Sequence, residues 1–147
     1  LSKKKKEIMN KFNILIIEDN NIVVMGIRKI YNKHFPDANI IHSENGLKAL
    51  ELLSKIKNDT DLPTFILLDI NMHVLNGIEF LEIINKDKRL KEIPVVIHTT
   101  SSNIEDYNAC QSLGVSNYYV KDIDFSIYKN NLITIADYWY NSFKNKI

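Results

Sequence analysis

The chain of 147 residues carries 19 basic and 18 acidic side chains, a net charge of +1 at pH 7, and is 45% hydrophobic. Its length fits one domain, and its balanced charge excludes a globally basic nucleic-acid-binding protein. The apolar runs, such as residues 65–68, are only as long as a strand, so we expect no transmembrane span. A single cysteine, Cys110, excludes an internal disulfide and favours a reducing, cytoplasmic compartment.

Short apolar segments alternate with segments of helical periodicity. Short runs that are apolar and rich in β-branched residues are typical of buried strands, and they predict strands at residues 13–17, 39–43, 64–69, 94–98 and 116–120. Helices are expected at about residues 22–35, 47–56, 77–84, 102–113 and 128–143. Ser102 and Glu105 have the spacing of a capping box, and Gly114 follows where a left-handed residue is expected. Five strand–helix pairs predict a doubly wound α/β sheet with parallel strands.

The two ends fall outside this pattern. The basic run Lys3–Lys6 has no apolar stretch behind it, which excludes a secretory signal and favours a solubilising tail. We therefore expect a flexible basic tail over residues 1–11, a globular domain over residues 12–143 and a short tail over residues 144–147.

Polar side chains stand at the carboxyl ends of four predicted strands: Glu18, Asp19, Asp69, Thr99 and Lys121. Ligands of such sheets bind outside the carboxyl ends of the strands, so we expect these side chains to converge. Neighbouring carboxylates repel one another, and a hard divalent cation such as Mg²⁺ removes that conflict. A metal, a lysine and a hydroxyl around one free carboxylate indicate phosphoryl transfer to that carboxylate.

The sequence resembles the response-regulator receiver domain of two-component signalling over nearly the whole globular chain. Five segments carry the resemblance in order, at residues 16–20 (IIEDN), 67–72 (LLDINM), 76–77 (NG), 93–100 (IPVVIHTT) and 114–121 (GVSNYYVK). The resemblance implies a flavodoxin-like (βα)5 fold, with a parallel five-stranded sheet in strand order 2-1-3-4-5. It also implies a bacterial, cytoplasmic phosphoprotein of a phosphorelay.

The resemblance assigns the acidic residues to phosphoryl acceptance and metal binding. Asp69 would accept a phosphoryl group from a sensor histidine kinase or a phosphotransfer protein. Asp19, Asp69 and the backbone carbonyl of Asn71 would bind Mg²⁺, with Mn²⁺ as the alternative, and Glu18 would act through water or through a lysine contact. The chain would be a phosphoacceptor and not an enzyme, assisting at most its own phosphorylation and dephosphorylation.

The resemblance assigns three other residues to the switch. Thr99 would move to bond a phosphoryl oxygen, and Tyr118 would turn inward when it does. Lys121 would pair with Asp69 before phosphorylation and with the phosphoryl group afterwards. Thr100 beside Thr99 is the alternative switch residue, but counting from Pro94 favours Thr99.

Two loops depart from the family pattern. Asp122 stands where receivers usually have a proline after a cis peptide, so we expect either a trans bond with a reshaped loop or a strained cis bond. His73 also replaces a common proline, and we expect it to be an exposed loop histidine, as we do His34 and His42. These changes put loop geometry and phosphoryl lifetime in question, but they remove no functional group.

The output is expected to be protein–protein contact. The last helix uses up the residues after Lys121, so we expect a stand-alone receiver, similar to those that serve bacterial phytochrome-type kinases. Its partners would be the kinase or phosphotransfer protein and a downstream protein target, with no nucleic acid and no membrane. Two interpretations of residues 138–140 stay open: a face for a homodimer or another partner, or core contact by Trp139 with the tyrosines half exposed.

Two other functions compete with this one. A degenerate receiver-like module would bind partners without phosphorylation, because of Asp122 and His73. A phosphatase of the haloacid-dehalogenase kind would use Asp69 as its nucleophile. That enzyme needs a second aspartate two residues later, where this chain has Asn71, so we rank it last.

Overall fold

The fold is known from a computed structural model that describes residue 3 and residues 12–146. The expected flexible tail over residues 1–11 therefore lies, except for Lys3, outside the described residues. Five parallel strands form one sheet in the order β2-β1-β3-β4-β5, which confirms the predicted fold class. The strands are β1 (Asn13–Ile17), β2 (Asn39–Ser43), β3 (Phe65–Leu68), β4 (Val95–Thr99) and β5 (Asn117–Val120).

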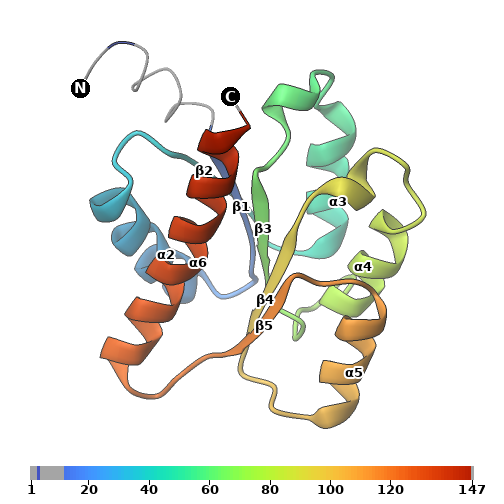
Figure 1. The fold of residues 1–147 in the computed structure, drawn as a ribbon. Coiled ribbons are helices and arrows are strands. Elements are labelled where there is room, and N and C mark those ends of the chain that lie inside the picture. The colour runs from blue at the N-terminus through green and yellow to red at the C-terminus, as the bar shows by residue number, and fades with distance from the viewer. Residues whose placement is uncertain (1–2, 4–11, 147) are drawn as a thin grey trace.

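Helices cover both faces of the sheet, α2 and α6 on one side and α3, α4 and α5 on the other (Figure 1). They are α2 (Asn21–His34), α3 (Gly46–Lys55), α4 (Gly77–Ile84), α5 (Ile104–Ser112) and α6 (Phe125–Asn145), with short 3₁₀ turns η1 (Asp59–Asp61) and η2 (Leu90–Glu92). Helix α6 continues two residues past the expected domain end, into the predicted tail. Over the described part of the chain, none of the helices has the length and apolar character that crossing a membrane requires.

The central strands are buried on both faces, which explains their uninterrupted apolar sequence. Every residue of β1 and β3 is buried. Leu15 and Ile17 pack toward α3 and α4, whereas Ile14 and Ile16 pack toward α2 and α6. The sheet is therefore held between two apolar layers, and charged groups are left to its edges and ends.

The side chains that cap two helices differ from the expectation. The N-cap of α5 is Asn103, whose side chain accepts a hydrogen bond from the Glu105 N–H, so the predicted Ser102–Glu105 capping box is wrong. A capping box does begin α4, between Asn76 and Glu79. Gly114 has φ 78°, the left-handed conformation expected after α5.

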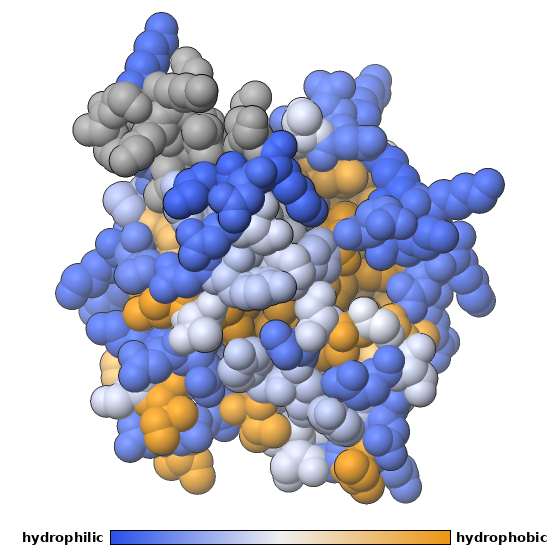
Figure 2. All heavy atoms as spheres, viewed as in Figure 1, coloured by the Kyte–Doolittle hydropathy of each residue, from blue (hydrophilic) through white to orange (hydrophobic). Residues whose placement is uncertain are grey.

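The exposed apolar side chains are unevenly spread. Figure 2 shows hydrophobic side chains gathering among hydrophilic ones at the amino-terminal end of α6, at the lower left. Ile123, Phe125 and Ile127 are the exposed apolar residues of that segment. At the other end of α6, Trp139 packs against the core while Tyr138 is 62% exposed. Core contact by Trp139 is therefore confirmed.

Candidate functional site

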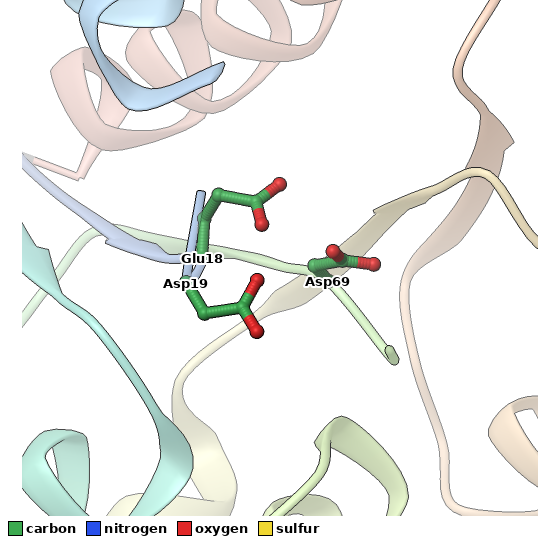
Figure 3. A group of neighbouring side chains, drawn as sticks. All are labelled: Glu18, Asp19 and Asp69. Atoms are coloured by element: carbon green, nitrogen blue, oxygen red, sulfur yellow. The ribbon is translucent and has the colours of Figure 1, made fainter. Parts of the chain in front are cut away.

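Three carboxylates meet at the carboxyl edge of the sheet (Figure 3). Glu18 and Asp19 follow β1, and Asp69 follows the adjacent strand β3. The two strands pair up to Ile17 and Leu68, and the Asp69 N–H donates to the Ile17 carbonyl at 3.1 Å. One oxygen from each carboxylate lies within 4.8 Å of the others. Glu18 and Asp69 are buried and Asp19 is half-buried, so water compensates these charges poorly.

Among the residues that the structure describes, one ammonium group reaches this cluster. Lys121 Nζ lies 2.5 Å from Glu18 Oε1 and 3.6 Å from Asp69 Oδ2, and only 12% of the lysine side chain is exposed. Burial nevertheless raises the pKa of Glu18 to about 7, and the charge of Asp69 adds to this effect while Lys121 opposes it. A single positive charge leaves three carboxylates undercompensated. Their oxygen atoms are the donors that hard divalent cations prefer, so the cluster fits a divalent metal site.

The β3–α4 loop holds two of the carboxylates in place. The Asn71 N–H donates to Asp69 Oδ1 at 3.3 Å, and the His73 N–H donates to Asp19 Oδ2 at 3.3 Å. These backbone donors orient the acid oxygens. Asn71 is exposed and lies at the rim of the cluster, and the role of its carbonyl as a metal ligand stays a prediction.

The same loop is tightly folded where it returns to the sheet. Val74 and Leu75 have φ values of 53° and 61°, in the left-handed region that is costly for branched side chains. A Cβ on Gly77 would lie 2.6 Å from the backbone oxygen of Asp69, so the start of α4 needs a glycine to pass this close. The loop with His73 in place of proline is thus closed against the end of β3.

The predicted switch residues lie beside the cluster, on the face covered by α3, α4 and α5. Thr99 is fully buried, whereas Thr100 is exposed, in agreement with the choice of Thr99. The Thr99 Oγ1 accepts a hydrogen bond from the Ser101 N–H at 3.2 Å. The Tyr118 hydroxyl donates to the Ser101 carbonyl at 2.9 Å, and its ring packs against the core. Tyr118 therefore already has an inward contact, which the sequence had placed after a movement of Thr99.

The segment after Lys121 resolves one open alternative. Over the described residues every peptide bond is trans, so the Lys121–Asp122 bond follows the trans alternative and not the strained cis one. Asp122 Oδ1 accepts from the Asp124 N–H at 2.8 Å, and Asp124 in turn caps α6. Two aspartates thus form the turn that a proline usually shapes.

Histidines are where the sequence analysis was least accurate. His34 and His42 were expected to be exposed loop residues. His34 is exposed, but it ends α2 and pairs with Asp137, whereas His42 is half-buried in β2, within the strand predicted at residues 39–43. The His42 Nε2 lies 2.8 Å from the Glu18 carbonyl oxygen, so this ring supports the acidic segment. His98 is buried at the end of β4, and burial first and the charge of Lys121 second lower its pKa to about 3. His98 lies two residues after Val96, on the same face of β4, and this spacing indicates that it is buried. The sequence does not indicate which side chains surround it.

A doubly wound sheet with carboxylates and a mostly buried lysine at its carboxyl edge has these groups where ligands of such sheets bind. Residues 14–132 match the family model described as response regulator receiver domain. The chain therefore belongs to the receiver domain family, as its sequence indicated.

Relatives and solved structures agree with this assignment. A probable methanogenesis regulatory protein, FilR2 of Methanothrix harundinacea, is 32% identical over 134 residues, covering 90% of this chain and 86% of the relative. The response regulator Rcp1 of Synechocystis is 30% identical over 128 residues, covering 86% and 87%.

Two solved structures share the fold over most of their length. The phosphorylated cyanobacterial phytochrome response regulator RcpA superposes with a TM-score of 0.80 and 27% identity, covering 88% of this chain and 94% of that one. The Mn²⁺-bound form of Rcp1 superposes with a TM-score of 0.78 and 29% identity, covering 87% and 94%. The suggested similarity to receivers of the phytochrome type is confirmed at this level, and the chain has a role in two-component signalling.

Proposed function

We propose that this chain is a response regulator that accepts a phosphoryl group on Asp69 and thereby changes a protein-interaction face. The observation that carries the proposal is the convergence of Glu18, Asp19 and Asp69 within 4.8 Å, with Lys121 Nζ 3.6 Å from Asp69. The donor would be a phosphohistidine of a sensor kinase or of a phosphotransfer protein. Two structural neighbours, RcpA in a phosphorylated form and Rcp1 in a Mn²⁺-bound form, support this proposal.

The reaction follows from the groups on the site. An Asp69 carboxylate oxygen attacks the phosphorus atom, the P–N bond to the donor imidazole breaks, and its electron pair leaves with the ring nitrogen. Asp19 and Asp69, with Glu18 beside them and the Asn71 carbonyl, would hold Mg²⁺ or Mn²⁺. The cation supplies charge compensation for the phosphoryl oxygens. Lys121 supplies a further positive charge, and its ammonium moves from Glu18 toward the phosphoryl group.

Thr99 completes the proposed site as a hydrogen-bond donor. Its Oγ1 accepts from the Ser101 N–H, which leaves its own hydroxyl hydrogen free to donate to a phosphoryl oxygen. A phosphoryl group adds about two negative charges at neutral pH, enough to draw Thr99 and Lys121 toward it. Signalling then requires a downstream partner that binds the two states with different affinity.

An intact-mass measurement tests this function. The protein is incubated with acetyl phosphate and Mg²⁺, and the proposal predicts the mass gain of one phosphoryl group in the wild type and none in Asp69→Asn. Chelation of the metal should abolish the gain, and Asp124→Asn, at the cap of α6, serves as a matched acidic control. Trp139 lines the same cavity as Pro63 and Thr64, which precede β3, so its fluorescence is a poor substitute for mass. A wild type that gains no mass, like Asp69→Asn, would instead favour the degenerate module that works without phosphorylation.

A further inference from the structure

The β4–α5 loop contains a residue whose hydrogen bonds join both predicted switch residues. Ser101 donates its N–H to Thr99 Oγ1 at 3.2 Å and accepts the Tyr118 hydroxyl on its carbonyl at 2.9 Å. Its main chain thus contacts the hydroxyl of β4 on one side and the aromatic ring of β5 on the other. A contact that fixes the orientation of Ser101 therefore also fixes the position of Tyr118 relative to Thr99.

The side chain of Ser101 is held from the neighbouring helix. Ser101 Oγ donates to Asp106 Oδ2 at 2.6 Å and accepts from the Asn103 N–H at 3.3 Å. The bond to Asp106 is of the charge-assisted kind, which is shorter and stronger than a bond between neutral groups. Asp106 lies in the first turn of α5 and Asn103 caps that helix, so the loop is tied to the start of α5.

Helix α5 also covers the ring of Tyr118. Tyr107, next to Asp106 on the helix, meets the Tyr118 ring edge-to-face, with centroids 5.3 Å apart and an interplanar angle of 72°. This is a favourable aromatic geometry. The same turn of α5 therefore holds the hydroxyl acceptor of Tyr118, through Ser101, and the outer side of its ring, through Tyr107.

We propose that Ser101 and Asp106 form a latch that keeps Tyr118 inward before any phosphoryl group is present. Both are positioning residues: they act through the loop and touch no reacting atom. The latch leaves the Thr99 hydroxyl hydrogen free, so a phosphoryl group can engage Thr99 without breaking the bonds of Ser101 to Asp106 and Tyr118. The inward state is then already populated in the free protein. The apparent affinity for a phosphoryl mimic is therefore not reduced by a need for molecules to rearrange first.

The effect of the latch on signalling rests on the proposed function, but its effect on Tyr118 does not. The two are separated by observing Tyr118 directly, through fluorine NMR of protein labelled with 3-fluorotyrosine. Tyr118→Phe assigns the signal. Spectra of the free protein test the latch, and titration with beryllofluoride and Mg²⁺ tests its coupling to the phosphoryl site.

In the wild type, the Tyr118 signal of the free protein should be that of a single, packed ring, and beryllofluoride should shift it little. Ser101→Ala and Asp106→Ala should move the free signal toward that of an exposed tyrosine. Beryllofluoride should restore the packed signal with an affinity about tenfold weaker than in the wild type, which equals about 1.4 kcal/mol. Ser101→Thr keeps the hydroxyl and should behave as the wild type.

The controls separate the latch from helix stability. Ser102→Ala changes the exposed neighbour of Ser101, and Glu105→Ala removes another acid from the first turn of α5. Both should leave the Tyr118 signal unchanged. An unchanged signal in Ser101→Ala and Asp106→Ala, or an exposed ring in the free wild type, would overturn the latch. A wild type with a packed ring that fails to bind beryllofluoride would overturn the proposed function, while the effect of the two variants on the free signal would still decide the latch.

Discussion

The two ends of the parallel sheet are built from opposite kinds of residue. At the amino ends of the strands, aromatic rings pack against one another, with Phe12 at 5.3 Å from Tyr140 and 5.4 Å from Phe35 between ring centroids. At the carboxyl ends, Glu18, Asp69 and Lys121 are buried together. At one end, the strands thus lead into aromatic rings that stabilise one another by burial. At the other end, they lead into carboxylates that repel one another.

This difference separates stability from function along the strand axis. Apolar burial at the amino end stabilises the fold without a ligand. At the carboxyl end, the buried carboxylates cost free energy that a bound cation can recover. Substitutions at the two ends should therefore differ in whether a metal ion relieves their effect.

The largest effect is expected at the aromatic end. Phe12 is fully buried, and Phe12→Ala leaves a cavity among several rings, so the free energy of unfolding should fall by about 3–5 kcal/mol. Urea denaturation measures this loss, with Phe125→Ala, which is 65% exposed, as the control of little effect. Because the site lies at the other end, the folded variant should bind Mg²⁺ as tightly as the wild type. A clear loss of Mg²⁺ affinity would contradict the separation of the two ends.

A somewhat smaller effect is expected from Lys121→Met. This change removes the ammonium that faces Glu18 and Asp69, and an uncompensated buried charge typically costs about 3 kcal/mol. Urea denaturation without a divalent cation should show this loss, and saturating Mg²⁺ should reverse most of it, since the cation replaces the missing positive charge. Lys48→Met, in an exposed pair with Glu44, is the matched control and should show no response to Mg²⁺ beyond that of the wild type. A loss that Mg²⁺ leaves unchanged would show that Lys121 serves packing instead of charge balance.

Metal binding itself should stabilise the wild type. At about a hundred times its dissociation constant, Mg²⁺ should add about 2.7 kcal/mol to the free energy of unfolding, provided that it binds only the folded state. Thermal melts at increasing Mg²⁺ measure the gain, and Asp19→Asn should lose most of it because one of the three carboxylates is gone. Equal gains in the wild type and in Asp19→Asn would place the cation elsewhere.

The smallest effect, taken over a single pH unit, is a pH dependence that arises from His98. Its folded pKa of about 3 lies below its ordinary value of 6.5, so the folded state disfavours the protonated ring. Its contribution to stability is complete above pH 6.5 and falls by up to about 1.4 kcal/mol per pH unit as the pH drops from there toward 3. His98→Leu should remove this slope, measured by urea denaturation at several pH values.

Glu18 acts in the opposite direction, and the comparison with His98→Leu cancels its contribution. Because its folded pKa is raised from 4.5 to about 7, it contributes stability at low pH that is lost as the pH rises through this range. The difference in unfolding free energy between the wild type and His98→Leu therefore isolates His98. A difference that stays constant from pH 7 to pH 4.5 would show that the ring is solvated or paired in solution.

The sequence predicted those features that depend on local pattern. Continuous apolar runs identified β1 and β3 because strands buried on both faces lack alternation. The rule for the carboxyl ends of parallel strands predicted that Asp19, Asp69 and Lys121 lie together, and counting from Pro94 predicted that Thr99 is the residue that faces inward. The spacing of Asn76 and Glu79 is also that of a capping box, the one that begins α4.

Features that depend on tertiary contacts were not predictable in this way. Ser102 has the spacing of a capping residue, but Asn103 caps α5 instead, and the side chain of Ser101 is engaged by Asp106. The trans peptide before Asp122 depends on a turn with Asp124. The rings of His98 and Tyr128 have their centroids 5.2 Å apart. This contact joins β4 to α6, and the spacing of residues along the chain does not predict it.

The central claim is that Asp69 takes a phosphoryl group in a site where Lys121 changes its partner. A crystal structure of the protein with Mg²⁺ and beryllofluoride tests this claim most directly. The account predicts the beryllium on an Asp69 carboxylate oxygen, the metal ion among Asp19, Asp69 and the Asn71 carbonyl, and Lys121 Nζ against a fluorine atom. A metal ion bound away from these carboxylates, or Lys121 still paired with Glu18 beside bound beryllofluoride, would contradict it.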